Sequence, residues 1–559
     1  MTFRSLLLAT SILASPALAH EGEEHRTEFL GLGRGASGLA APQGAPVLIP
    51  GLGTYGMPVA TAEPLAQAWF DQGLGHLWGF NHAEAVRAFR EAQALDPACA
   101  MCVWGEAYAL GPNLNDIMHP EAEARAWEAT NQAATLAREP LEVALTQALL
   151  ARYAEPGQGD RAALNQAFAD AMQEVAAAYP DDANVQVLLA DALMNLQPWD
   201  YWEPGGLRPK GNGAEIVSTL ERAMALAPDH PAALHLYIHA VEASADPAQG
   251  EAAADRLAAQ DLTAGHLAHM PAHIYNRIGR YADSIAANRT AIAADEAFLA
   301  RAGEAASPLY RYGYVPHNVH FLLVAAQSAG LSEDAVASAE RLSALTSDEL
   351  AAGYAWVQAI GTAQYIVHAQ MSDPATVLAL PEPEAGFPYV RGFRHFARGL
   401  AQVRAGDLGA AEAEREAIRE IIDTADLSDL EAQFLPARDV LGLAERMVGA
   451  RIAEAEGRDD EAVALLREAV AIETAIPYME PPYWYAPVSR TLGAVLLAQG
   501  RTEEAQAAFE TALAQAPRDA WALWGLWQAK NGTPEAQAAR EAFEEAWLGD
   551  AEEPRLDQL

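Results

Sequence analysis

The stretch W-F-D-Q-G-L-G-H-L-W-G-F-N-H-A-E-A-V-R-A-F-R-E-A-Q-A-L-D-P at residues 69–97 decides the fold of this chain. Apolar residues recur every three or four positions in both of its halves, which predicts two amphipathic helices. Small residues at Gly73, Ala85 and Ala92 allow paired helices to approach closely, and Pro97 breaks the chain after the second helix. The stretch therefore predicts a pair of antiparallel helices.

Similar stretches recur along the chain. A second good copy spans residues 486–519, with matching positions at Leu492, Gly493, Ala505, Phe509, Ala512 and Pro517. Weaker copies end at Pro180 and Pro228, and others run through residues 279–285, 406–411 and 457–462. Alanine-rich amphipathic segments fill most of the remaining chain, and β-branched runs with a period of two are absent. We therefore predict an all-α repeat protein.

This pattern resembles the tetratricopeptide-repeat family, whose signature places W, L-G, Y, A, F and P at fixed spacings within about 34 residues. His76 stands where the family prefers tyrosine. The resemblance implies a right-handed superhelix of antiparallel helix pairs (an α-solenoid) over residues 61–551, with insertions near 197–213 and 297–315. The segments F-N-H-A-E-A-V-R-A-F-R-E-A, D-P-A-C-A-M-C-V-W-G-E-A, H-M-P-A-H-I-Y and V-P-H-N-V-H-F are also similar to a group of exported bacterial tetratricopeptide proteins. This second resemblance strengthens the fold prediction and leaves the function open.

The two ends of the chain differ from the repeats in composition. Residues 1–19 combine Arg4, an apolar run and the small-x-small site Ala17-Leu18-Ala19, which is typical of a secretory signal peptide. Residues 20–60 are rich in Gly, Ala and Pro and predict an extended arm, and residues 552–559 form an acidic tail. No later apolar run reaches the roughly 18 residues needed to cross a bilayer. We therefore expect an exported protein without membrane insertion, periplasmic if the source is Gram-negative.

The charge of the chain is strongly negative, with 76 acidic residues and a formal net charge of -40. Nucleic acids and anionic membranes require a basic surface, so this composition argues against both kinds of partner. Negative charge also favours the attraction of metal cations.

The two cysteines, Cys99 and Cys102, form a C-x-x-C motif directly after Asp96-Pro97. At a helix N-terminus such a motif can cycle as a redox pair. The strand–helix context of a thioredoxin-like site is missing, which favours a local, weakly constraining disulfide or a packed pair of thiols over a redox role.

Histidines are concentrated in one part of the chain, with eight of fifteen between His230 and His320. Their spacings of three and four residues place them on shared helix faces. Each tetratricopeptide repeat has a first and a second helix. In the family's numbering these histidines occupy positions 2, 5 and 9 of the first helix in three repeats, and Glu242 occupies position 12. The resemblance implies that these positions line the concave groove. The set is His235, His239, Glu242, His266, His269, His273, His317 and His320.

A set of imidazoles with one carboxylate suits a transition metal such as zinc, copper or iron. The leading hypothesis is therefore an exported scaffold with a metal site in its groove. One alternative is a periplasmic adaptor that binds a peptide or an envelope protein without metal, and a second is a metalloenzyme with Glu242 or Tyr275 as a proton-transfer group. The predicted groove residues are Tyr275, Asn276, Arg277, Trp199, Trp202 and Tyr312.

Overall fold

The computed structural model describes residues 47–53, 56–303, 306–383, 386–549 and 554–559. The predicted signal peptide, most of the predicted arm and the first residues of the acidic tail lie outside these ranges. The helices up to residue 303 are α2 (Pro64–Trp78), α3 (His82–Leu95), α4 (Ala100–Ala109), α5 (Pro120–Leu136), α6 (Pro140–Leu150), α7 (Arg161–Ala178), α8 (Ala183–Met194), α9 (Gly213–Leu226), α10 (Pro231–Val241), α11 (Glu251–Ala258), α12 (Gly265–His269), α13 (Pro271–Ile278) and α14 (Tyr281–Ala302).

The second half of the chain is helical as well. Its helices are α15 (Val315–Ser328), α16 (Ser332–Leu345), α17 (Asp348–Gly353), α18 (Ala355–Gly361), α19 (Ala363–Met371), α20 (Pro374–Leu378), α21 (Pro388–Ala405), α22 (Leu408–Thr424), α23 (Ser428–Ala432), α24 (Ala437–Ala455), α25 (Asp459–Ala475), α26 (Val488–Ala498), α27 (Thr502–Gln515), α28 (Ala520–Ala529) and α29 (Ala536–Ala546). Short 3-10 helices span Pro247–Gly250 and Leu556–Gln558, and a π-helix spans Tyr310–Tyr314. Beyond two isolated β-bridges, the described residues contain no β-structure.

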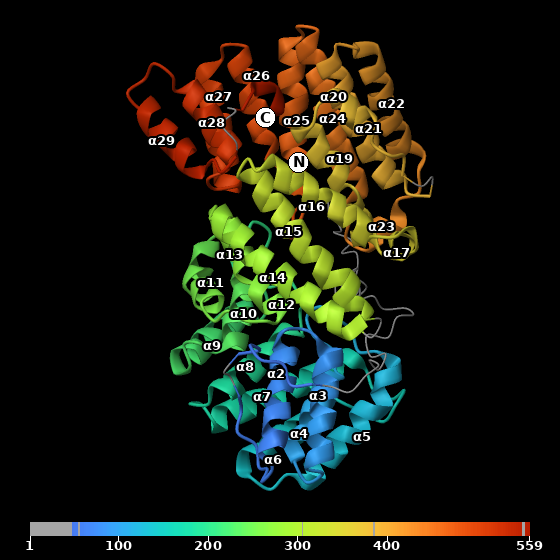
Figure 1. Cartoon of the computed structure of the whole chain (residues 1–559), viewed down its shortest axis with the longest axis vertical. Helices are drawn as coiled ribbons and strands as arrows, with labels where there is room; N and C mark the ends of the chain where they lie inside the picture. The colour runs from blue at the N-terminus through green and yellow to red at the C-terminus, as the bar shows by residue number, and fades with distance from the viewer. Residues whose placement is uncertain (1–46, 54–55, 304–305, 384–385, 550–553) are drawn as a thin grey trace, which may run out of the picture.

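Consecutive helices pack in pairs, among them α2 with α3, α15 with α16, α24 with α25 and α26 with α27. The pairs follow one another along the long axis of the molecule, from α2–α6 at one end to α26–α29 at the other (Figure 1). This arrangement confirms the predicted all-α superhelical solenoid of tetratricopeptide type.

Glycines explain how closely the paired helices approach. Phe89 of α3 lies between Gly73 of α2 and Gly105 of α4, and a Cβ atom added at either glycine would stand 2.5 Å from the Phe89 ring. Phe509 of α27 lies in the same way between glycines of α26 and α28. Only residues without a side chain leave room for these rings. We call the Phe89 and Phe509 arrangements the two phenylalanine layers.

Contacts between segments that are distant in sequence cover the inner helices of the solenoid. The Trp521 indole in α28 donates a hydrogen bond to the Gln327 carbonyl of α15 over 2.7 Å. The Leu548 amide after α29 donates to the Ala329 carbonyl over 2.9 Å. Just before α12, the Thr263 amide donates to the Gly51 carbonyl of the N-terminal segment over 2.7 Å. These contacts join segments that are distant in sequence around the inner helices.

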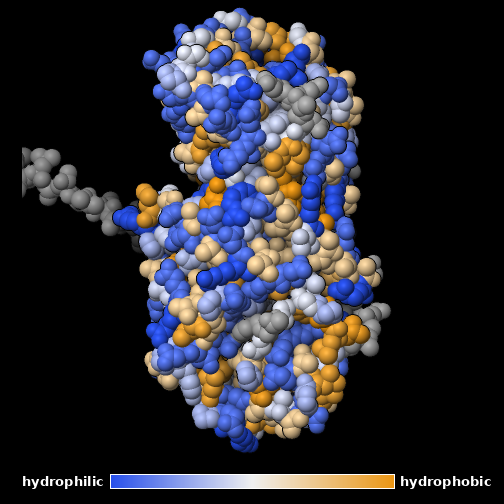
Figure 2. Space-filling model, turned by 60° about the vertical axis from the view of Figure 1, so that its left-hand side comes forward, coloured by the Kyte–Doolittle hydropathy of each residue, from blue (hydrophilic) through white to orange (hydrophobic). Residues whose placement is uncertain are grey.

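The two predicted insertions have different structures. Residues 197–213 form a loop with a bridge between Trp202 and Pro209. In the region of 297–315, α14 continues to Ala302, and the π-helix Tyr310–Tyr314 leads directly into α15. Figure 2 shows that hydrophilic residues cover much of the face in view, with hydrophobic residues in small groups among them. Within the described part of the chain, each helix is too short or too polar to cross a membrane.

Candidate metal centre

Helices α10, α12, α13 and α15 bring the predicted histidines together. The His230 side chain caps α10 by accepting from the Ala233 amide, and Pro231 occupies the first turn. Pro271 starts α13 directly after α12, so His269 is the last residue of one helix and His273 lies in the first turn of the next. The two helices bring these imidazoles together, with their Nε2 atoms 2.7 Å apart.

Six histidines form two neighbouring groups. His235, His239 and His266 each offer a ring nitrogen within 4.8 Å of the others, and His269, His273 and His317 do the same. In the first triad the Nε2 atoms of His235 and His266 are 3.2 Å apart. In the second triad, His273 Nε2 lies 2.7 Å from His269 Nε2 and 3.5 Å from His317 Nε2. We call these six residues with Glu242 and Glu480 the histidine core.

The histidine core lies inside the protein. Five of its imidazoles are no more than 2 % exposed, and His317 alone is half-buried. Neighbouring segments therefore cover these residues, and the expectation that they line the concave groove of the solenoid stays a prediction. The expectation that they converge on one inner surface is consistent with the distances.

Hydrogen bonds fix the tautomers of four of these histidines. His235 Nδ1 donates to the Trp78 carbonyl over 2.8 Å, and His269 Nδ1 donates to Asn288 Oδ1 over 2.7 Å. His239 Nδ1 and His273 Nδ1 donate to Glu242. Because every acceptor here is a carbonyl or a carboxylate, the proton of a neutral ring sits on Nδ1 and Nε2 carries a lone pair. This is the usual orientation of metal-ligating histidines.

Glu242 and Glu480 hold the centre of the cluster. Glu242 accepts from His239 Nδ1 over 2.7 Å with one oxygen and from His273 Nδ1 over 2.6 Å with the other. Glu480 also accepts from His273 Nδ1 over 2.6 Å. The Tyr478 hydroxyl lies 3.2 Å from both carboxylates. His239, Glu242, His273 and Glu480 thus make a third group that is able to hold an ion.

One phenylalanine packs on each triad. The Phe80 ring centroid lies 4.5 Å from that of His235 and 5.0 Å from that of His266. The Phe321 centroid lies 4.5 Å from that of His273 and 4.9 Å from that of His317. These apolar rings restrict water, which strengthens every interaction among the polar groups.

The backbone is strained beside the first triad. Phe80 has a φ angle of 53° and Trp199 one of 62°, and Trp199 places its ring edge-on to His239 with centroids 4.9 Å apart. Left-handed backbone at bulky residues is uncommon and is concentrated at functional sites. The loop at 197–213 therefore contributes a wall to this triad.

Burial sets the charge of the imidazoles. It lowers the pKa of His239 to about 3 and places the pKa values of His235, His266, His269 and His317 well below their usual range. His273 differs: burial opposes its charge, but Glu242 and Glu480 outweigh burial and raise its pKa to about 10. Burial, followed by the charge of Glu242, raises the pKa of Glu480 to about 7. Five rings are therefore neutral, which is the metal-binding form.

His320 is separate from both triads. Its Nε2 lies 2.7 Å from the Tyr485 hydroxyl, and burial lowers its pKa to about 3. It lies one turn beyond His317 on α15 and faces the loop between α25 and α26. Its role as a ligand stays a prediction without support from this geometry.

The predicted groove residues make their hydrogen bonds within the chain. The Tyr275 hydroxyl donates to Asp255, Arg277 donates to the backbone of Glu242 and Ser244, and Trp202 donates to the Ala240 carbonyl. Trp199 donates to Asn115. Asn276 and Tyr312 are half-buried. Most of these side chains hold the helices and loops around the histidine core, and their binding of a partner stays a prediction.

Sequence reasoning missed Glu480 and Tyr478. Both lie in the P-Y-M-E-P-P-Y-W-Y stretch, residues 477–485, more than 200 positions from His273 in the chain. The only signal in the sequence for a site residue here was Glu480, a single acidic residue within an aromatic segment between helical regions. Sequence spacing alone does not indicate which distant loop reaches the histidines.

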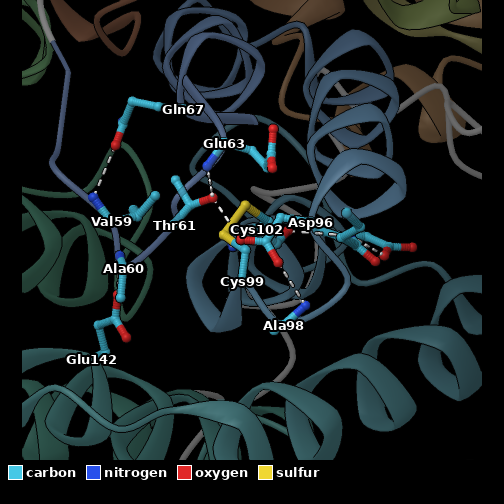
Figure 3. The surroundings of a disulfide bond; sticks show 12 residues. Val59, Ala60, Thr61, Glu63, Gln67, Asp96, Ala98, Cys99, Cys102 and Glu142 are labelled. Atoms are coloured by element: carbon cyan, nitrogen blue, oxygen red, sulfur yellow. Dashed lines mark hydrogen bonds between the residues drawn. A yellow bond between two sulfur atoms is a disulfide. The ribbon is translucent and has the colours of Figure 1, made fainter. Parts of the chain in front are cut away.

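Cys99 and Cys102 form a disulfide at the start of α4, and both side chains are fully buried. The segment around Thr61 covers it, with the Thr61 hydroxyl donating to Asp96 and the Ala60 amide donating to Glu142 (Figure 3). A partner thiol therefore has no access to the sulfur atoms in this arrangement. The redox role stays a prediction.

Comparison with known proteins identifies no family. No family model matches the chain, and no curated protein matches it. Among solved structures, the chain is similar to the human IFIT1 dimer with m7Gppp-AAAA, at 12% identity and a TM-score of 0.28 over 87% of this chain and 90% of that one. It is also similar to yeast Tom70, at 13% identity and a TM-score of 0.27 over 86% of this chain and 91% of that one. At such scores these likenesses carry no argument about function.

Proposed function

We propose that this protein binds two transition-metal ions, one in each three-histidine group of the histidine core. The proposal depends on one observation: ring nitrogens of these histidines face one another inside the protein. His269 Nε2 and His273 Nε2 lie 2.7 Å apart, while the Nδ1 atoms of both rings already donate to acceptors. Two lone pairs at this distance repel each other, and a cation between them removes the repulsion.

Without an ion, a proton takes that place. The raised pKa of His273 means that its ring is an imidazolium, which donates from Nε2 to His269. In the first triad, His239 Nε2 is buried and has no hydrogen-bond partner among the described residues. Buried polar atoms are normally satisfied, so this atom favours a ligand over a purely structural network.

The donor set indicates the class of ion. The first triad offers three neutral imidazoles, and the second offers two together with His273, whose Nε2 proton an ion displaces. Neither triad includes a thiolate, and such a donor set suits zinc, copper or iron. Three protein ligands leave a coordination position open, whereas structural zinc sites are usually filled by four. The carboxylates of Glu242 and Glu480 act on Nδ1 atoms, where they orient the rings and increase their basicity.

Two other arrangements compete with this proposal. A single ion bound by His239, Glu242, His273 and Glu480 is one, and it uses Nδ1 atoms instead of Nε2 atoms. An adaptor that binds a peptide without metal is the other. The burial of the imidazoles disfavours direct peptide contact with them.

The experiment is elemental analysis of the full chain, purified without a tag or chelator, with four single variants, of which Glu480→Gln tests the four-ligand site. His266→Gln removes a ligand of the first triad and His317→Gln removes one of the second, and neither residue is bonded to Glu242 or Glu480. We expect two ions in the wild type and one in each of the two triad variants. The control is His320→Gln, which replaces a buried histidine outside both triads and leaves two ions.

The outcomes separate the possibilities. One ion in the wild type, retained in both triad variants and lost in Glu480→Gln, indicates the four-ligand site instead. No ion in the wild type, even after reconstitution with zinc, copper(I) or iron(II), overturns the proposal and leaves the adaptor.

A metalloenzyme is the second candidate function, favoured by the open coordination position and by the partial exposure of His317. Cobalt(II) substitution tests it through the visible spectrum of the bound ion. Azide that shifts this spectrum occupies the open position and supports a catalytic site. A spectrum unchanged by saturating azide counts against catalysis and leaves metal binding intact.

A further inference from the structure

We propose that the two three-histidine sites bind their ions cooperatively and that Glu242 couples them. This inference rests on the proposed function. It concerns the regulation of the sites, because a cooperative pair loads both ions together and releases both together. Glu242 is the residue on which the argument depends.

Glu242 contacts one histidine from each triad. Oε1 accepts from His239 Nδ1 in the first triad and Oε2 accepts from His273 Nδ1 in the second, at 2.7 and 2.6 Å. The side chain of Glu242 is fully buried, as is that of His273. A single rigid carboxylate plane therefore connects the two sites with one hydrogen bond on each side.

The backbone around Glu242 is held in place. Its amide donates to the Ile238 carbonyl at the end of α10, and its carbonyl accepts from Arg277 Nε over 3.0 Å. Arg277 Nη2 also donates to the Ser244 carbonyl. Because α13 holds the end of α10 in this way, the carboxylate reorients only by rotation of its side chain.

A bound ion fixes the proton of its ligand. When His239 Nε2 coordinates an ion, the ring becomes a stronger donor at Nδ1 and its existing bond to Glu242 Oε1 tightens. The tightened bond restricts rotation of the carboxylate, whose Oε2 already accepts from His273 Nδ1. The ring of His273 is then more rigidly held before the second ion arrives, so the second binding step loses less freedom.

The second triad transmits the effect in the reverse direction. His273 Nδ1 is shared between Glu242 and Glu480, which approach it equally at 2.6 Å. An ion on His273 Nε2 confines the proton to Nδ1 and strengthens both acceptor bonds. By reciprocity, the free energy of coupling is the same whichever site is filled first.

Glu242→Gln is the sharpest test of the coupling. The glutamine side chain has one acceptor oxygen, and its amide nitrogen only donates. It keeps the bond to one Nδ1–H and loses the other, at nearly constant volume. The experiment titrates the full chain with zinc and counts species with zero, one and two ions by native mass spectrometry. The control is His320→Gln, which leaves Glu242 and both triads unchanged.

Independent equal sites give a one-ion species of about half of the protein at half-saturation, and unequal independent sites give more. We expect at most about a quarter in the wild type and in the control, which corresponds to a coupling of about tenfold. We expect half or more in Glu242→Gln. The wild-type populations test the coupling even if this variant does not fold.

Each remaining outcome has one meaning. A wild type that takes up two ions through a one-ion species of half or more overturns cooperativity and leaves the proposed function intact. If the one-ion population is small in the wild type and equally small in Glu242→Gln, the sites are coupled but Glu242 does not couple them. A wild-type protein that binds no zinc, copper or iron contradicts the proposed function itself.

Discussion

The phenylalanine layers and the histidine core both involve the first helices of the repeats, but they are stabilised differently. Phe89 and Phe509 each fill a space between two glycines of flanking helices. Everything that such a layer needs lies within three consecutive helices. The histidine core instead draws its acceptors from the end of α2, from α14 and from the loop after α25.

This difference shows what a repeat scaffold tolerates. An apolar ring is satisfied by close packing, which the repeat provides everywhere. A buried imidazole requires a hydrogen-bond partner or a ligand for each nitrogen, and neighbouring repeats do not provide enough of them. Polar residues at inner positions therefore depend on contacts with segments that are distant in sequence.

Replacing the phenylalanine of either layer with alanine is expected to have the largest effect on stability. Phe89→Ala and Phe509→Ala each leave a cavity and should lower local stability by about 3–5 kcal/mol. Hydrogen exchange of α2–α4 and α26–α28 measures the loss, and each variant should affect its own layer because repeats interact with their neighbours. Metal content should stay at the wild-type value. A loss below about 1 kcal/mol would mean that the flanking helices collapse into the space.

Filling the layers sharpens the comparison from the opposite side. Gly73→Ala places a Cβ atom 2.5 Å from Phe89, and Gly493→Ala places one 2.8 Å from Phe509. Overpacking should cost about 1–3 kcal/mol in each case, measured from chemical denaturation. Gly442→Ala in α24 is the matched control, since its nearest neighbour would be 3.6 Å away. It should stabilise by about 0.5–1 kcal/mol, and an equal loss at all three positions would contradict the packing argument.

Asn288→Leu tests whether the histidine core depends on partners outside the triads. The variant removes the acceptor of His269 Nδ1 while keeping a similar volume. Metal affinity of the second triad should fall about 10–100-fold, as measured by competition with a chelator. Asn288→Asp keeps an acceptor oxygen and should retain most of the affinity. Equal affinities in wild type and Asn288→Leu would show that the ring orientation is set by packing alone.

The two triads should also differ in pH dependence. An ion on His273 Nε2 displaces the proton that a pKa of about 10 holds there. Affinity at the second triad should therefore rise about tenfold per pH unit between about pH 7 and 9 and level off above 10. The first triad is already neutral, so its affinity should be flat in that range. His266→Gln leaves only the second triad intact and His317→Gln leaves only the first, so the two can be measured separately. Equal slopes of metal affinity against pH in the two variants would contradict the assignment of the proton to His273.

Much of the histidine core was predictable from spacing. His235 and His239 are four residues apart on α10, which places both on one helix face. His269 and His273 have the same spacing, but Pro271 divides them between α12 and α13, and the packing of these two helices brings them together. His320 shows the limit of this reasoning. It matches the register of the other histidines, but the loop carrying Tyr485 covers its side of α15.

The sequence by itself determined the all-α repeat fold and the helix face that His235 and His239 share. Both follow from local patterns: small and aromatic residues at fixed spacing, and helical periodicity. Only the tertiary structure decided that the histidines are buried, that Glu242 connects the two triads and that Glu480 completes the cluster. These features depend on which distant segments meet in the folded chain, and side-chain spacing carries no information about contacts between segments more than 200 residues apart.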